Sequence, residues 1–138
     1  PFAGRKYGIM RKFVLIDDDQ ISNLLHREVL RQVDPGAEVH VFSSSLEGLE
    51  MLKQLINAGK GIPDYLFLDI RMPEMSGFEL LDELMKLPID KVKQMKIYML
   101  TSSLDDRDRS RSAQYPIITD FRGKTLTIRA LKEILSLT

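Results

Sequence analysis

Three short apolar runs in the sequence each end abruptly at a polar residue. The residues that end them are Asp17, Asp69 and Thr101. A run of about four consecutive apolar residues is typical of a strand that is buried on both faces of a parallel sheet. The sequence therefore predicts a parallel sheet whose strands lead into side chains that can take part in chemistry.

Two further apolar segments also predict strands, and five amphipathic segments predict helices. Strands and helices alternate along the chain. Helical spacing of apolar residues, Gly and Pro stops, and a capping-box pair at Ser44 and Glu47 set the boundaries. The predicted strands cover 13–16, 39–42, 65–68, 97–100 and 117–121, and the predicted helices cover 21–33, 44–56, 78–85, 105–113 and 126–135. Such alternation predicts an α/β domain with a doubly wound five-stranded parallel sheet, flavodoxin-like strand order 2-1-3-4-5 and helices on both faces.

Composition excludes several classes of protein. The 138 residues contain no Cys, so a disulfide framework, a zinc–thiolate site and a thiol nucleophile are all excluded. The 20 basic and 20 acidic residues balance, so nothing indicates a polyanionic partner such as DNA. No apolar run approaches the roughly 18 residues that a membrane span needs. We therefore expect a cytoplasmic domain that binds neither nucleic acid nor membrane.

The first nine residues differ from the rest of the chain. They contain two Gly, one Arg and one Lys without an apolar period. They also lack the apolar stretch of roughly 7–15 residues that a secretory signal needs. We predict that Met10 is the natural start and that 1–9 are a cloning remnant, with a short natural disordered tail as the alternative. Residues 10–138 then form one folded domain.

The carboxyl ends of parallel strands meet at one edge of the sheet, where functional residues collect. We expect this edge to gather Asp17 and Asp18 after the first strand, Asp69 after the third, Thr101 after the fourth and Lys124 after the fifth. Carboxylates held close together repel one another, and Mg²⁺ relieves that repulsion because it prefers oxygen ligands. A lysine and a hydroxyl can hold phosphoryl oxygens while one carboxylate attacks phosphorus. The pattern thus indicates phosphoryl transfer to a carboxylate.

These residues resemble the receiver domain of two-component response regulators, the chemotaxis-type regulators among them. The resemblance covers residues 10–138, and it is carried by 13–19 (FVLIDDD), 68–77 (LDIRMPEMSG), 99–102 (MLTS) and Lys124. The Met-Pro pair and the Gly downstream of Asp69 make the match specific. The resemblance implies a stand-alone, single-domain receiver.

For the acidic cluster, the resemblance implies that Asp69 is the phosphoacceptor and that Mg²⁺ is the cofactor. Asp17 and Asp18 look like the metal-binding pair, with Asp18 a direct ligand and Asp17 a ligand through water. Asp69 and the backbone carbonyl of Arg71 would complete the protein's share of the metal ligands.

For the switch, the resemblance implies that Thr101 is the hydroxyl that moves onto the phosphoryl group. Phe121 looks like the aromatic residue that turns inward with it, and Lys124 looks like the lysine that pairs with phosphoryl oxygens. The family usually carries Pro after this lysine, with a cis bond between them, whereas here the residue is Thr125. A cis bond before a non-proline residue costs about 2.5–4 kcal/mol, against roughly 0.5–1 kcal/mol before Pro, so we predict a trans bond and a rerouted loop.

The implied function is that of a phosphoacceptor signalling switch in a two-component phosphorelay. A histidine kinase or a histidine phosphotransfer protein would donate the phosphoryl group, and a downstream protein partner would recognise the change. We do not expect an enzyme in the ordinary sense, because only weak self-phosphotransfer and slow autodephosphorylation are implied. We expect a monomer or a weak dimer.

Two alternatives belong to other functional classes. A receiver-like module that binds partners without phosphorylation would lack a pocket residue, and none is missing. A phosphohydrolase of the haloacid-dehalogenase type would share the pattern Asp17-x-Asp19. Such enzymes need a further acidic motif after the lysine, where only Glu133 follows here, and they usually need a cap domain for which the chain is too short.

Several polar residues have purely structural interpretations. Asp19 is predicted to cap the first helix. His26 is predicted to be exposed on the outer face of that helix, and His40 to lie on a strand surface. The alternating charges of 105–111 predict a solvated helix with i,i+4 pairs, or alternatively a polar face for partner recognition.

Overall fold

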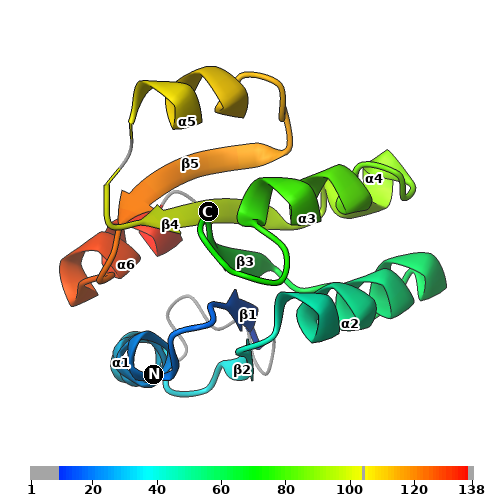
Figure 1. The fold of residues 1–138 in the computed structure, drawn as a ribbon. Helices are drawn as coiled ribbons and strands as arrows, with labels where there is room; N and C mark the ends of the chain where they lie inside the picture. The colour runs from blue at the N-terminus through cyan, green and yellow to red at the C-terminus, as the bar shows by residue number, and fades with distance from the viewer. Residues whose placement is uncertain (1–9, 104, 137–138) are drawn as a thin grey trace.

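The computed structural model describes residues 10–103 and 105–136, so the prediction about 1–9 lies outside the described residues. Its strands form one sheet in the order β2-β1-β3-β4-β5, and every neighbouring pair is parallel (Figure 1). The strands are β1 (Lys12–Ile16), β2 (Glu38–Phe42), β3 (Tyr65–Asp69), β4 (Lys96–Thr101) and β5 (Ile118–Gly123). The predicted strand order is confirmed.

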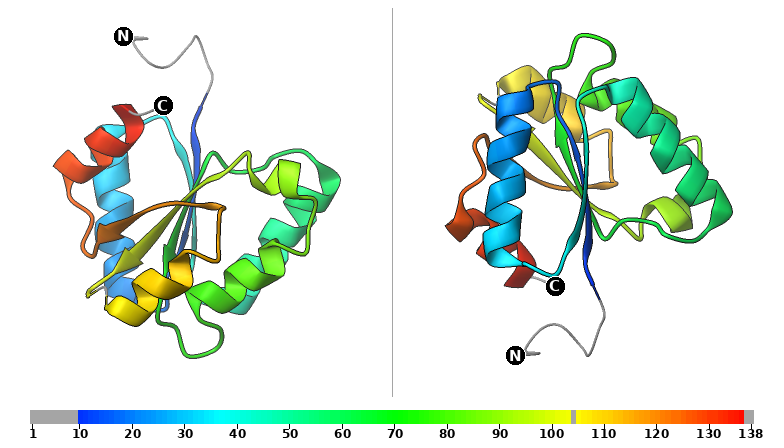
Figure 2. Two further views of the ribbon diagram at one scale, coloured as in Figure 1. Left: turned by 90° about the horizontal axis from the view of Figure 1, so that it is seen from above. Right: turned by 90° about the horizontal axis from the view of Figure 1, so that it is seen from below.

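Helices cover both faces of the sheet, as the sequence predicts. In Figure 2, α1 and α6 lie against one face and α2 and α3 against the other. The helices are α1 (Gln20–Val33), α2 (Ser45–Ala58), α3 (Gly77–Leu84), α4 (Ile89–Val92), α5 (Asp106–Ser112) and α6 (Ile128–Ser136). Helix α4 is absent from the helices that the sequence predicts, because a single helical turn is too short to show a period. Within the described part, no helix has the length and apolar character that crossing a bilayer requires.

The sheet separates the core into two layers. Phe13 and Leu15 of β1 pack into the layer beneath α1 and α6, whereas Val14 and Ile16 pack into the layer beneath α2 and α3. All four are at most 1% exposed. Burial of each such side chain contributes roughly 1.5–3 kcal/mol. Because both faces of β1 are covered, the strand has no polar alternation, which explains the continuous apolar run in the sequence.

Helix caps place the first turns of α1 and α3 directly beside the strand ends. The side chain of Asp19 accepts hydrogen bonds from the N–H groups of Ile21 and Ser22, which confirms its predicted capping role. Ser76 and Glu79 form a reciprocal capping box that starts α3. The caps thus fix where α1 begins, at Gln20 shortly after β1, and where α3 begins, at Gly77 after the loop that follows β3.

The buried side of α1 differs from the one predicted. The buried residues are Ser22, Asn23, His26 and Leu30. By contrast, Ile21, Leu24 and Leu25 are 69%, 69% and 50% exposed. The prediction that His26 is exposed is therefore wrong, since its residue exposure is 1%. Polar side chains occupy the inner face because Asn23 and His26 find hydrogen-bond partners there.

Candidate functional site

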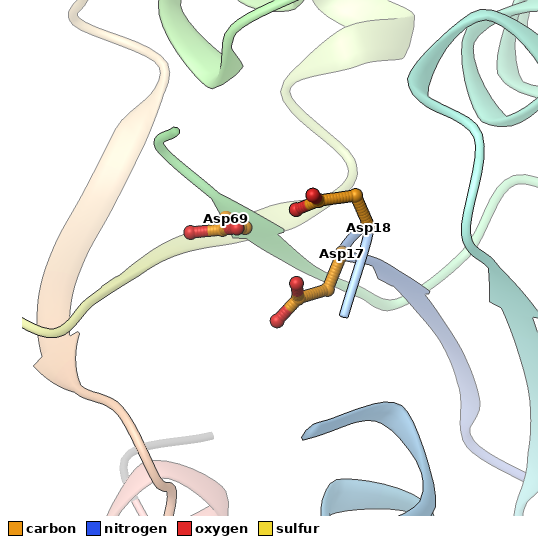
Figure 3. Close-up of side chains that lie close together, drawn as sticks. All are labelled: Asp17, Asp18 and Asp69. Carbon is orange, nitrogen blue, oxygen red and sulfur yellow. The ribbon is translucent and has the colours of Figure 1, made fainter. Parts of the chain in front are cut away.

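The three acidic residues predicted at the sheet edge lie together where β1 and β3 end. These strands are neighbours, with Ile16 of β1 opposite Leu68 of β3, so the residues that follow them meet. Carboxylate oxygens of Asp17, Asp18 and Asp69 lie within 4.8 Å of one another (Figure 3). Asp17 and Asp69 are buried, whereas Asp18 is exposed, so the cluster is open to solvent on one side.

Asp17 is held in place by both β2 and α1. Its N–H donates to the carbonyl of Phe42 (3.1 Å), and its own carbonyl accepts from Nδ2 of Asn23 (2.8 Å). Its Oδ1 accepts from the N–H of Asp19 (2.9 Å). These contacts fix the direction of the carboxylate and leave Oδ2 facing the ammonium group of Lys124.

Lys124 brings a positive charge to the acidic cluster. Its Nζ lies 2.9 Å from Oδ2 of Asp17 and 3.4 Å from Oδ2 of Asp69. Its backbone N–H donates to the carbonyl of Thr101 (2.9 Å), which ties the loop after β5 to the end of β4. Lys124 therefore lies at the carboxyl edge of the sheet, as the sequence predicts.

The Lys124–Thr125 peptide bond is cis, so the prediction of a trans bond and a rerouted loop is wrong. Local preference favours trans before a non-proline residue, but tertiary contacts hold the chain on both sides of this bond. Lys124 donates its N–H to Thr101, and the N–H of Leu126 donates to Nε2 of His26 (3.0 Å). The path of the loop is therefore set by its partners.

The pKa values of Asp69 and Lys124 are both raised at the site, where negative charge gathers. Burial and the nearby charge of Asp17 raise the pKa of Asp69 from 3.8 to about 6, although Lys124 acts in the opposite direction. Burial disfavours the charge on Lys124, but hydrogen bonding and attraction to Asp17 and Asp69 outweigh it and raise the pKa of this lysine. One ammonium group therefore does not neutralise the cluster.

The raised pKa of Asp69 predicts a measurable dependence of stability on pH. Between pH 3.8, the ordinary value, and about 6 the folded protein holds a proton that the unfolded chain releases, so this residue makes stability fall as pH rises. Asp69→Asn removes that titration. In EDTA, the Tm of the variant should exceed that of the parent by a few degrees at pH 7, and the difference should shrink toward pH 4. Parallel Tm profiles for the two proteins would contradict this.

Thr101 and Phe121 lie on the two strands beside this edge. Thr101 is the last residue of β4 and is 7% exposed, and its Oγ1 donates to the carbonyl of Ser103 (2.8 Å). Its single hydroxyl proton is therefore not donated to the acidic cluster. Thr101 does not cap α5 either, because Asp105 does so. Phe121 on β5 lies opposite Met99 and is partly buried against the layer beneath α2 and α3.

Arg71 connects the acidic cluster to α5. Its N–H lies 3.4 Å from Oδ1 of Asp69, and its Nη2 lies 2.6 Å from Oδ2 of Asp108 and 3.7 Å from Oδ2 of Asp105. Asp108 is 7% exposed. The other residues of α5 are exposed or partly exposed, as the prediction of a solvated helix expects. The prediction is wrong at Asp108, whose carboxylate meets the guanidinium group of Arg71.

Sequence reasoning missed two contributors to the site, Asn23 and His26. Asn23 orients the backbone of Asp17, and His26 contacts the loop that carries Lys124. Their spacing, together with Leu30, matches one face of a helix. Helical periodicity could have identified Asn23, His26 and Leu30 as one buried face of α1 if polar residues had been allowed at buried positions.

The set of donor atoms suits a hard divalent cation. Three carboxylates offer oxygen atoms in close proximity, and their mutual repulsion is only partly relieved by Lys124. Mg²⁺ takes oxygen ligands, retains several waters and is usually bound through one or two carboxylates together with phosphate oxygens. The residues present therefore fit such an ion, and the exposed side of the cluster leaves room for its waters.

Comparison with known proteins gives consistent matches over nearly the whole chain. Residues 13–136 match the family model of the response regulator receiver domain. The sensor histidine kinase CheAY of Helicobacter pylori is 33% identical over 99 residues, which are 72% of this chain and 11% of that protein. The chain thus spans only a small part of this curated relative.

Solved structures show the same fold. A two-component response regulator from Cytophaga hutchinsonii has 28% identity and a TM-score of 0.82, with 93% of this chain and 96% of that chain covered. The Mn²⁺-bound form of response regulator Rcp1 has 22% identity and a TM-score of 0.68, with 91% and 88% covered. These similarities agree with the fold and with the strand order of this chain.

Proposed function

Because this chain belongs to the response regulator receiver domains, we propose that it is a signalling switch that accepts a phosphoryl group on Asp69. The observation that carries the proposal is the grouping of Asp69 with two further carboxylates and the ammonium group of Lys124 at one sheet edge. Receiver domains are normally signalling switches rather than metabolic enzymes. Any hydrolysis of the acyl phosphate by this chain is therefore proposed to be slow.

In the proposed reaction, a carboxylate oxygen of Asp69 attacks the phosphorus of a phosphohistidine. An O–P bond forms, the donor's N–P bond breaks, and the imidazole nitrogen leaves with the electron pair and takes up a proton. Deprotonated Asp69 is the reactive form, and its pKa of about 6 leaves it mostly ionised at neutral pH. The partner is thus proposed to be a histidine kinase or a histidine phosphotransfer protein.

Mg²⁺ is the proposed cofactor, with Asp17, Asp18, Asp69 and the backbone carbonyl of Arg71 as ligands. When bound, it would supply positive charge that offsets the charge of phosphoryl oxygens. The fit rests on the three neighbouring carboxylates, and the Mn²⁺-bound form of Rcp1 is a receiver relative that holds a divalent ion. Asp17, fixed by β2 and α1, keeps its oxygens in one place without reorganisation.

Lys124, Thr101 and Phe121 are proposed to respond to the phosphoryl group on Asp69. Lys124 pairs with phosphoryl oxygens, since its Nζ already lies 3.4 Å from Asp69. Thr101 turns its hydroxyl from Ser103 toward the phosphoryl group, and Phe121 moves inward on the adjacent strand. A downstream protein then recognises the altered surface by direct contact.

Binding of beryllofluoride, which mimics a phosphoryl group on a carboxylate, tests this proposal. With Mg²⁺ present, titration followed by amide NMR should shift signals from the β3 and β5 ends, including Ile70 and Gly123. The shifts should vanish in EDTA, and they should be absent in Asp69→Asn. Absence of binding to the parent protein in Mg²⁺ would overturn the proposal and would favour a receiver-like module that binds partners without phosphorylation.

A further inference from the structure

His26 lies inside the protein, on the face of α1 that is turned toward the site. It is 1% exposed, and its Nε2 accepts a hydrogen bond from the N–H of Leu126 at 3.0 Å. The two residues are separated by 100 positions in the sequence, so the contact joins the first helix to the loop between β5 and α6. Neither the reaction nor the metal ligands proposed above use this residue.

The contact requires a specific form of the imidazole ring. A backbone N–H can only donate, so Nε2 of His26 must offer its lone pair, and the neutral ring then carries its proton on Nδ1. Burial lowers the pKa of His26, in agreement with a neutral ring. The charges that act on the ring are those of Asp17, Lys124 and Asp19. His26 is therefore a hydrogen-bond acceptor in the core.

The hydrogen bond between Leu126 and His26 lies in the loop that carries Lys124 to the site. Leu126 follows Lys124 by two residues, and it is 1% exposed, in the core layer beneath α1 and α6. The loop is thus held at Lys124 by the carbonyl of Thr101 and at Leu126 by His26. Residue 125 is Thr, so no proline ring restricts the backbone between these two points.

The same face of α1 holds the other half of the site. Asn23, one turn before His26, donates to the carbonyl of Asp17 at 2.8 Å. One helix face therefore sets the distance between the carboxylate of Asp17 and the loop of Lys124, whose Nζ lies 2.9 Å from Oδ2 of Asp17. Rigid elements that support a charged side chain in this way keep it in its working position.

We propose that His26 is a positioning residue that holds the loop of Lys124 in place, so that the ammonium group reaches Asp69 and its phosphoryl group. The inference rests on the proposed function and adds to it the residue that fixes the phosphoryl-binding lysine. His26 acts through the N–H of Leu126 and does not contact the reacting atoms.

The test compares two substitutions that differ in hydrogen-bonding ability. His26→Leu fills the space with an apolar side chain and leaves no acceptor, whereas His26→Gln can present an amide oxygen near the position of Nε2. With Mg²⁺ present, His26→Leu should weaken beryllofluoride binding about tenfold, the size expected for loss of one buried hydrogen bond, and His26→Gln should stay within about threefold of the parent. Equal binding by the parent and His26→Leu, or equal weakening by both variants, would overturn the proposal.

A control separates positioning from loss of stability. Leu52→Ala removes a fully buried side chain of α2, in the opposite core layer, and should lower the Tm while leaving beryllofluoride affinity unchanged at temperatures where the protein is folded. If Leu52→Ala weakens binding as much as His26→Leu does, the effect of His26 is merely structural and the proposal fails.

A second measurement needs no phosphoryl mimic. Hydrogen exchange of the Leu126 amide should be about tenfold faster in His26→Leu than in the parent or in His26→Gln, because the acceptor is gone. If exchange of the Leu126 amide is faster in His26→Leu but the parent does not bind beryllofluoride, the proposed function is refuted, and so is the role of His26 in phosphoryl binding. The structural claim that His26 anchors the loop would still hold. Unchanged exchange in His26→Leu would refute the anchor itself.

Discussion

Replacement of Asp69 with Asn is expected to abolish labelling of the protein by acetyl phosphate in Mg²⁺. The amide of Asn is not a nucleophile, so the O–P bond of the acyl phosphate cannot form on that residue. Asp17, the other buried carboxylate of the cluster, is paired with Lys124 at 2.9 Å and directed by its contacts with β2 and α1. Intact-mass spectrometry should therefore detect a phosphorylated species for the parent and only background for Asp69→Asn.

Glu74 provides a matched control in the same loop. It is an exposed carboxylate five residues after Asp69, and its Oε1 accepts a hydrogen bond from the hydroxyl of Ser44 (2.9 Å). Glu74→Gln removes a negative charge near the site without touching the acidic cluster, so labelling should persist at the level of the parent. Labelling that survives Asp69→Asn would show that another residue accepts the phosphoryl group.

Substitution of Gly77 by Ala should produce the largest loss of stability from adding a single methyl group. A Cβ atom at this position would lie 2.5 Å from the carbonyl oxygen of Asp69 and 3.1 Å from Cα of Ile70. Both are backbone atoms at the end of β3, and the N–H of Gly77 donates to the carbonyl of Ile70 at 2.8 Å. Neither side can move without breaking the start of α3, so we expect a loss of about 1–3 kcal/mol or more, as for overpacked cores.

Urea unfolding of Gly77→Ala and of Gly123→Ala would check this expectation. Gly123 lies directly before Lys124, but a Cβ added there meets nothing within 4 Å, so its substitution should change the free energy of unfolding by at most about 0.5 kcal/mol. The displaced carbonyl of Asp69 should also weaken beryllofluoride binding by Gly77→Ala. Equal stability of the two variants would mean that α3 can shift without cost.

Much of the fold could be predicted because the buried strands carry an unambiguous signal. The apolar run ending at Asp17 has no alternation, and β1 is indeed covered on both faces. Once such strands alternate with helices, chain connectivity places their carboxyl ends at one edge. The grouping of Asp17, Asp18, Asp69 and Lys124 then follows from topology, without knowledge of any individual contact.

The parts that could not be predicted depend on contacts between distant segments. The apolar residues of α1 identify a helix, but the inner side is chosen by hydrogen bonds from Asn23 to Asp17 and from Leu126 to His26. Helical periodicity does not contain this information, which is why it predicts an exposed position for His26. The geometry after Lys124 escaped prediction for the same reason, since partners on β4 and α1 set it.

The attachment of α5 has a thermodynamic consequence. The helix buries only Asp108, and it is held through Arg71, through Arg111 near Asp82 (3.8 Å) and through the same Arg111 over the ring of Phe78 (4.9 Å). A displacement of this helix would uncover charged groups and, beyond the ring of Phe78, little apolar surface. Exposure of apolar surface is what produces a large heat-capacity change. The free energy of displacing α5 would therefore depend on temperature with little curvature, and added salt would reduce it by screening the ion pairs of Arg71 and Arg111.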